Sequence, residues 1–150
     1  MSMSESRVLA AELAQWLRRH GAFQRLTSVE VTGHLTSVVT AWGASHGWAA
    51  RREAAAGITA TARSGRTRTG MLDLLFHRPG GSRLAVEIDR GNKRWSLEKL
   101  IHQADTGGCA VWLRWDTKPC PVVIPPQVGL VELRVHQHRV SDGRRRYSLV

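Results

Sequence analysis

The stretch 71-MLDLLFHRPGGSRLAVEID-89 decides the predicted fold, because two short apolar segments flank a tight turn within it. The Pro-Gly-Gly sequence between them is a strong turn signal. Residues 71–76 and 83–89 are therefore predicted to form the two strands of an antiparallel hairpin. Glu87 and Asp89 lie two residues apart in the second strand, so the alternation of side chains places both carboxylates on one face.

The same turn predicts the register of the hairpin. A turn centred near Gly80 pairs residues whose numbers sum to about 160, which places Asp73 directly opposite Glu87. Facing carboxylates repel one another unless a positive charge joins them. A hard divalent cation such as Mg²⁺ or Mn²⁺, which takes oxygen ligands, is one such partner. The open alternative is a network of ion pairs with the arginines that lie nearby in the sequence, which needs no metal.

The rest of the chain completes an α/β pattern within one domain over residues 1–150. Helices are predicted at 7–20, 27–47 and 95–105, further strands at 48–55 and 109–115, loops at 57–70 and 117–126, and a last hairpin at 129–150. The segment 57–70 is also compatible with an irregular hairpin. A strand–helix–strand crossover after an antiparallel hairpin implies a mixed sheet with helices on its faces. The core is expected at about 27–116, with the N-terminal helix and the C-terminal hairpin outside it.

Composition favours a nucleic-acid partner and argues against other classes. The 150 residues carry a net charge of +10, which attracts polyanions through phosphate contacts. Two cysteines are too few for a disulfide framework, and the N-terminal segment lacks the features of a signal peptide. No apolar run reaches the length of a membrane span, so a cytoplasmic protein without a membrane partner is expected.

The strings 70-GMLDLLF-76 and 84-LAVEID-89, with the turn between them and the helix after them, resemble the PD-(D/E)XK nuclease superfamily over about 27–115. The resemblance implies an αβββαβ, restriction-endonuclease-like core and metal-dependent hydrolysis of phosphodiester bonds, with DNA favoured over RNA. It implies that Asp73 and Glu87 bind Mg²⁺ or Mn²⁺. Glu30 stands where members often carry a further glutamate, and is expected to make an outer contact. A capping box with Thr27 is the alternative role for Glu30.

The sequence departs from the motif at Asp89, which occupies the position of the motif lysine. One explanation is that Lys93, four residues on, reaches the site and assists catalysis. Another is that Asp89 adds a third metal ligand, or that the site is inactive. The chain would then be a catalytically inactive nuclease-fold module that binds nucleic acid within a larger complex. Glu53 is a further candidate acid. Cleavage of both strands of a duplex usually needs two sites, so a homodimer is compatible with the active interpretation.

Cationic, aromatic and amide side chains near the predicted site supply candidate nucleic-acid contacts. They are Arg66, Arg68, Arg90, Arg94, Trp95, Lys99 and Gln103. Trp95 either stacks on a base or covers the sheet. Lys99 and Gln103 are spaced i and i+4 on a helix, so they are predicted to share a polar face, from which Gln103 alternatively reaches the metal. The arginine runs at 63–68 and 144–146 suit phosphate contacts that position a nucleic acid.

Overall fold

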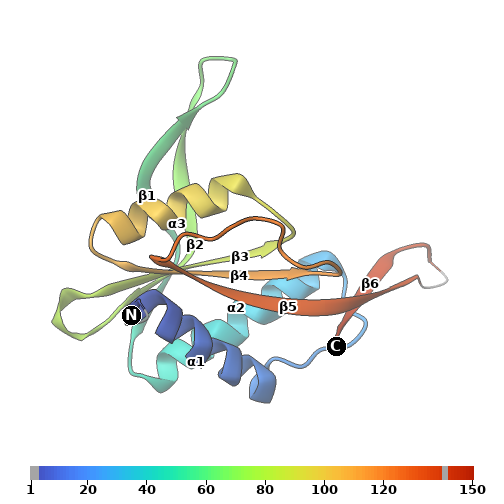
Figure 1. The fold of residues 1–150 in the computed structure, drawn as a ribbon. Coiled ribbons are helices and arrows are strands. Elements are labelled where there is room, and N and C mark those ends of the chain that lie inside the picture. Colours follow the sequence, from blue (N-terminus) through green and yellow to red (C-terminus); the bar gives the residue numbers. More distant parts are fainter. Residues whose placement is uncertain (1–3, 140–141) are drawn as a thin grey trace.

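The structure is a computed structural model that describes residues 4–139 and 142–150. It contains a six-stranded sheet in the order β1-β2-β3-β4-β5-β6 (Figure 1). In chain order the elements are α1 (Glu5–His20), α2 (Ser28–Ser45), β1 (Ala49–Thr61), β2 (Thr67–His77), the short 3₁₀ helix η1 (Pro79–Gly81), β3 (Arg83–Arg90), α3 (Arg94–Asp105), β4 (Cys109–Asp116), β5 (Val128–Arg139) and β6 (Arg145–Leu149). The predicted αβββαβ order is confirmed as α2-β1-β2-β3-α3-β4.

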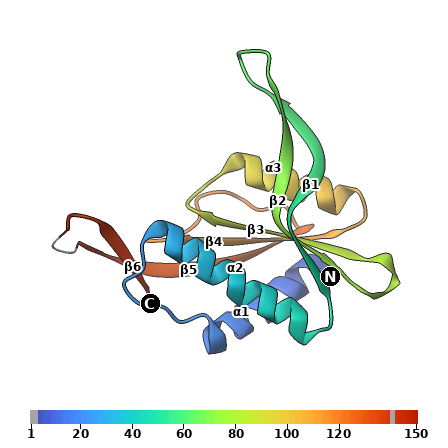
Figure 2. The same cartoon turned by 180° about the vertical axis from the view of Figure 1, so that it is seen from behind.

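The helices cover both faces of the sheet. Helices α1 and α2 lie on one face and α3 lies on the other, as the two opposite views show (Figures 1 and 2). Two apolar clusters fill the two layers, and alternate residues of β3 belong to different clusters. Val86 and Ile88 face α1 and α2, whereas Ala85 packs with the leucines of α3. Since Glu87 and Asp89 share the parity of Ala85, they face α3.

The register of the β2–β3 hairpin is the predicted one. The pairs Leu74↔Val86 and His77↔Arg83 both sum to 160. The tight turn fixes this register, with Gly80 and Gly81 at φ of +78°, a conformation that side chains disfavour. After the hairpin, β3, α3 and β4 form the expected parallel crossover, and β5 is also parallel to β4.

The segment 57–70 forms an irregular hairpin, so its prediction as a loop is wrong and the alternative is confirmed. β1 runs on to Thr61 and pairs with β2 from Thr67. The pairing is irregular between Ala55 and Thr59, around Gly57 at φ of +82°. Small residues mask the strand pattern here, because few of them are large enough to show an apolar alternation. The resulting two-stranded arm rises past α3 in both views (Figures 1 and 2).

The C-terminal hairpin pairs β5 with β6 in antiparallel register, as predicted. Part of its predicted turn, at residue 141, lies outside the described residues. Leu26, just before α2, bridges to Tyr147 of β6, which ties this hairpin to the start of α2. No helix in the described part of the chain has the length and apolar character needed to cross a membrane.

Candidate acid–lysine site

The β1–β2 arm separates from β3 at Asp73, and we call this point the fork. The β2–β3 pairing ends at Leu74↔Val86, whereas β2 stays paired with β1 on both sides of Asp73. Carboxylates accept hydrogen bonds from backbone N–H groups at the fork. The Ile88 N–H donates to Asp73 Oδ2 at 2.7 Å, and the Asp73 N–H donates to Glu87 Oε2 at 3.3 Å. The predicted convergence of Asp73 and Glu87 across the hairpin is therefore present.

Lys99 of α3 completes the fork. Its ammonium lies in contact with Glu87 Oε1 and donates to the Met71 carbonyl oxygen at 2.6 Å. Glu87 is 1% exposed and Lys99 is 7% exposed, so this pair lies within the protein. Glu87 Oε1 lies against the ammonium, yet it accepts no directed hydrogen bond from the described residues. An acid from each of two strands and a lysine from the helix thus meet at one point.

Burial, together with the hydrogen bond and the like charge of Asp73, raises the pKa of Glu87 to about 9. The Lys99 ammonium opposes this shift without cancelling it. A pKa raised this far favours a proton on Glu87 at neutral pH in the metal-free protein, because two neighbouring carboxyl groups resist carrying two negative charges. A perturbed acid beside a fixed cation is typical of functional sites.

Asp89 has separate partners, although it lies on the same face as Glu87. Its Oδ2 accepts a hydrogen bond from Trp112 Nε1 at 2.9 Å, and its Oδ1 lies 3.6 Å from Lys93 Nζ. Lys93 is an exposed side chain that pairs with Asp89, and no contact joins it to Asp73 or Glu87 among the described residues. The prediction that Lys93 substitutes for the motif lysine is therefore wrong in this structure. Lys99 holds the position beside the acids.

The predicted set of three metal ligands is not assembled. Over residues 4–139 and 142–150, no three His, Cys, Asp or Glu side chains gather closely enough to hold a metal ion together. Asp73 and Glu87 form a pair, and Asp89 is engaged elsewhere. A pair still fits Mg²⁺, which protein sites often hold through one or two carboxylates while it keeps several waters. Glu87 Oε1 already contacts the Lys99 ammonium, so a metal ion at this pair would have to compete with that cation for the oxygen.

Glu30 does not join the site. It forms the capping box with Thr27, whose N–H donates to Glu30 Oε1 at 3.0 Å, and it lies 3.4 Å from an Arg146 nitrogen. Six residues separate Glu30 from Thr36, the α2 residue that lines a hollow with Asp73, so they lie about 9 Å apart along the helix. The alternative helix-cap role is confirmed, and the predicted outer contact with the acid site is wrong.

Gln103 and Lys99 are buried, which contradicts their prediction as a solvated face that contacts nucleic acid. Gln103 Nε2 donates to the Ala56 carbonyl oxygen at 2.7 Å. This carbonyl lies in the irregular part of β1, and Gln103 supplies its hydrogen bond. The buried face of α3 contains Ser96, Lys99 and Gln103 beside its leucines. The spacing i, i+3, i+7 of these three residues is the pattern of one helix face, so the sequence does contain a signal for a buried polar stripe. The apolar stripe beside it is the stronger signal, and it leads to the prediction that the polar residues are solvated.

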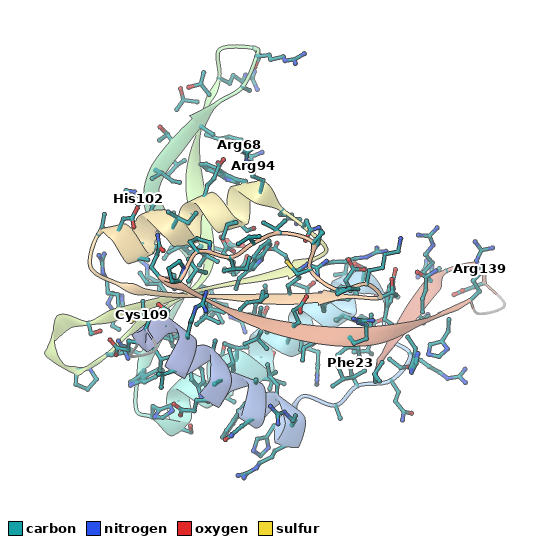
Figure 3. All side chains as sticks on the ribbon, in the orientation of Figure 1. Phe23, Arg68, Arg94, His102, Cys109 and Arg139 are labelled. Atoms are coloured by element: carbon teal, nitrogen blue, oxygen red, sulfur yellow. The ribbon has the colours of Figure 1, made fainter. Side chains whose placement is uncertain are left out.

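The remaining predicted contacts are spread over different surfaces. Arg66 and Arg68 are exposed on the β1–β2 arm, and Arg94 is exposed at the start of α3 (Figure 3). Trp95 is half-buried, and its ring would lie 3.0 Å from a Cβ placed on Gly70 of β2, so it covers the sheet as its alternative role predicted. Arg90 projects toward the opposite face, since its guanidinium lies over Trp115.

Asp73 also lines a hollow of about 320 Å³ with Thr36, Arg52 and Glu53. Glu53 stands opposite Asp73 in the β1–β2 register and adopts a φ of +50°. This conformation is uncommon outside glycine. The hollow gives the fork an opening on the α2 side, whereas Glu87 and Lys99 close it on the α3 side.

The sequence matches no family model, and no curated protein is significantly similar to it. Among solved structures, the chain is similar to one described as the structure of Pyrococcus furiosus SfsA in complex with Ca²⁺. The identity is 13%, the TM-score is 0.41, and the match covers 81% of this chain and 62% of the SfsA chain. The chain thus spans 62% of the length of that protein.

Proposed function

We propose that the protein is a metal-dependent nuclease of PD-(D/E)XK type that hydrolyses phosphodiester bonds in DNA. The observation that carries this proposal is the meeting of Asp73, Glu87 and Lys99 at the fork. The resemblance of the sequence to the superfamily implies two acids and a lysine, and the helix supplies the lysine that the strand lacks. The net charge of +10 favours a polyanionic substrate.

In this proposal Asp73 and Glu87 would hold Mg²⁺ or Mn²⁺. Such an ion lowers the pKa of a bound water and neutralises charge on a phosphate. The Lys99 ammonium, fixed by Glu87 and the Met71 carbonyl, contributes a positive charge that needs no rearrangement when negative charge develops. The net reaction adds one water across a phosphodiester bond and yields a phosphate monoester and a free hydroxyl group. Asp89 and Lys93 serve as a neighbouring structural pair.

Cleavage assays test this proposal. Supercoiled plasmid and end-labelled single strands of DNA and RNA are incubated with Mg²⁺, Mn²⁺ or EDTA. We expect nicking with either metal, none with EDTA, and nicking on the order of 10³-fold slower by Glu87→Gln. Glu98→Gln is the matched control, because it makes the same change at a half-exposed glutamate of α3. If Glu87→Gln cleaves as fast as the parent protein, the activity belongs to another site or to a contaminant.

A specific observation favours a second candidate, the catalytically inactive module that binds nucleic acid. Glu87 is buried, holds a proton at neutral pH and already has Lys99 as a partner. Metal binding must therefore displace that proton and compete with the ammonium. If a wide range of protein concentration leaves all substrates intact with both metals, while binding persists and weakens steeply with salt, the module is favoured.

A further inference from the structure

A second site lies on the opposite face of the sheet from Lys99, where the start of α2 meets β6 (Figures 1 and 2). A hollow of about 460 Å³ opens there. Its lining includes Ser28 and Val29 of α2, Arg90 at the end of β3, and Arg144, Arg145 and Tyr147 of the last hairpin. The fold thus brings the guanidinium group of Arg90 to the same hollow as those of Arg144 and Arg145, which lie more than fifty positions later in the sequence.

These three arginines have no carboxylate partner within the described part of the chain, since neither Arg90, Arg144 nor Arg145 forms an ion pair there. The acid nearest to them along α2 is Glu30, which accepts from the Thr27 N–H and pairs with Arg146, while the charge of Arg144 also helps to lower the pKa of Glu30. The hollow therefore has a surplus of positive charge. A site with several unpaired guanidinium groups suits a phosphate, which guanidinium binds in a bidentate manner.

The guanidinium of Arg90 is held in place before any ligand arrives. It lies 5.0 Å from the ring centroid of Tyr147 and 5.8 Å from that of Trp115. These cation–π contacts hold the guanidinium near the two rings, and no hydrogen bond from it to another described residue is present. Tyr147 is 1% exposed and lines the hollow, and its hydroxyl has no hydrogen-bond partner among the described residues. Tyr147 therefore contributes its ring to the hollow, and the groups there that can bind an anion are the guanidinium groups.

The position of the hollow relates it to the acid site. Ser28 lines the hollow and Thr36 lines the opening beside Asp73, and the two residues are eight positions, or about 12 Å, apart along α2. On β3, Arg90 is three residues beyond Glu87, or about 10 Å along the strand. A single polynucleotide strand that runs along α2 has phosphates at separations of this order.

We propose that this hollow binds a backbone phosphate of a nucleic-acid strand and so positions the next part of that strand at the fork. The inference takes its nucleic-acid partner from the proposed function, but it does not require cleavage. Because the contact is with a phosphate, the hollow is expected to bind DNA and RNA strands without preference for sequence.

Binding is measured by fluorescence anisotropy in EDTA, with labelled DNA and RNA single strands of about 16 nucleotides. The variants are Arg90→Gln and Arg145→Gln. Arg83→Gln is the control, because it lies at the other end of β3, about 23 Å from Arg90. We expect each hollow variant to weaken binding about tenfold and to lower the slope of log K against log salt by about 1, with little change for the control.

Arg145 is exposed and packs on no ring among the described contacts, so its variant remains informative if Arg90→Gln fails to fold. If both hollow variants match the Arg83→Gln protein in affinity and in salt slope, the inference is overturned. If the parent protein binds the strands but does not cleave them, and the hollow variants weaken that binding, only the proposed nuclease activity is contradicted. No binding of either strand by the parent protein would contradict both.

Discussion

Glu87 and Asp89 lie two residues apart on one face of β3, and both are buried, yet their surroundings differ. Glu87 meets a second acid and a buried lysine, and burial raises its pKa. Asp89 meets an indole N–H and an exposed lysine. The difference comes from the elements that pack against each carboxylate. Lys99 of α3 contacts Glu87, while Trp112 of β4 donates a hydrogen bond to Asp89. Two carboxyl groups on one face of β3 thus have different roles, Glu87 in the acid–lysine site and Asp89 in a structural contact.

The largest effect is expected for the acid at the fork. Glu87→Gln removes a proposed metal-holding carboxylate, so we expect cleavage to fall on the order of 10³-fold. Asp89→Asn keeps an oxygen toward the Trp112 N–H and is expected to lower cleavage less than about tenfold. Single-turnover rates with Mn²⁺ measure both. Equal losses for the two variants would end the distinction between the two carboxylates.

The two lysines provide the second test. Lys99→Met removes the cation beside Glu87, and we expect a loss of about 10²-fold in cleavage, typical of a lost charge-stabilising group. Lys93→Met removes an exposed partner of Asp89, which contributes little, so the rate is expected to change less than about threefold. Circular dichroism and thermal melts confirm that each variant is folded. A larger loss for Lys93→Met than for Lys99→Met would return the catalytic role to Lys93.

The sequence predicts the contacts that a few adjacent residues determine, but not those that depend on how a helix packs on the sheet. The turn at Gly80 fixes the hairpin register, so the meeting of Asp73 and Glu87 followed from a few adjacent residues. Lys99 could not be placed in the same way, because a helix shows which residues share a face but not how far that face rotates toward the sheet. The buried face of α3 contains Lys99 and Gln103 as well as Leu97 and Leu100, so it is rotated relative to the apolar stripe that the sequence shows.

The pH dependence of stability gives the third test. The folded protein holds a proton on Glu87 up to about pH 9, whereas the unfolded chain releases it above its ordinary value of 4.5. Raising the pH within this window therefore favours unfolding, at about 1.4 kcal/mol per pH unit for one proton. Urea unfolding in EDTA from pH 5 to 9 measures this. We expect stability to fall with pH in the parent protein and to fall less in Glu87→Gln.

The outcome that contradicts this prediction is the same pH dependence in both proteins. It would mean that Glu87 is ionised in the folded state and that the Lys99 ion pair outweighs burial. Asp89→Asn, which removes the other buried carboxyl group of β3, is measured in parallel to show how much of any change in the pH dependence is specific to Glu87.

The smallest effect is expected at the partner of Asp89. Trp112→Phe keeps a buried aromatic ring but removes the N–H that donates to Asp89 Oδ2 at 2.9 Å. Trp42→Phe is a matched control, since Trp42 is equally buried and its indole N–H has no partner among the described residues. Because a hydrogen bond to a charged group contributes about 2 kcal/mol, Trp112→Phe should lower the free energy of unfolding by about that much more than Trp42→Phe. Cleavage per folded molecule should stay unchanged in both. A fall in cleavage that exceeds the loss of folded Trp112→Phe protein would show that Asp89 and its indole partner belong to the reacting site after all.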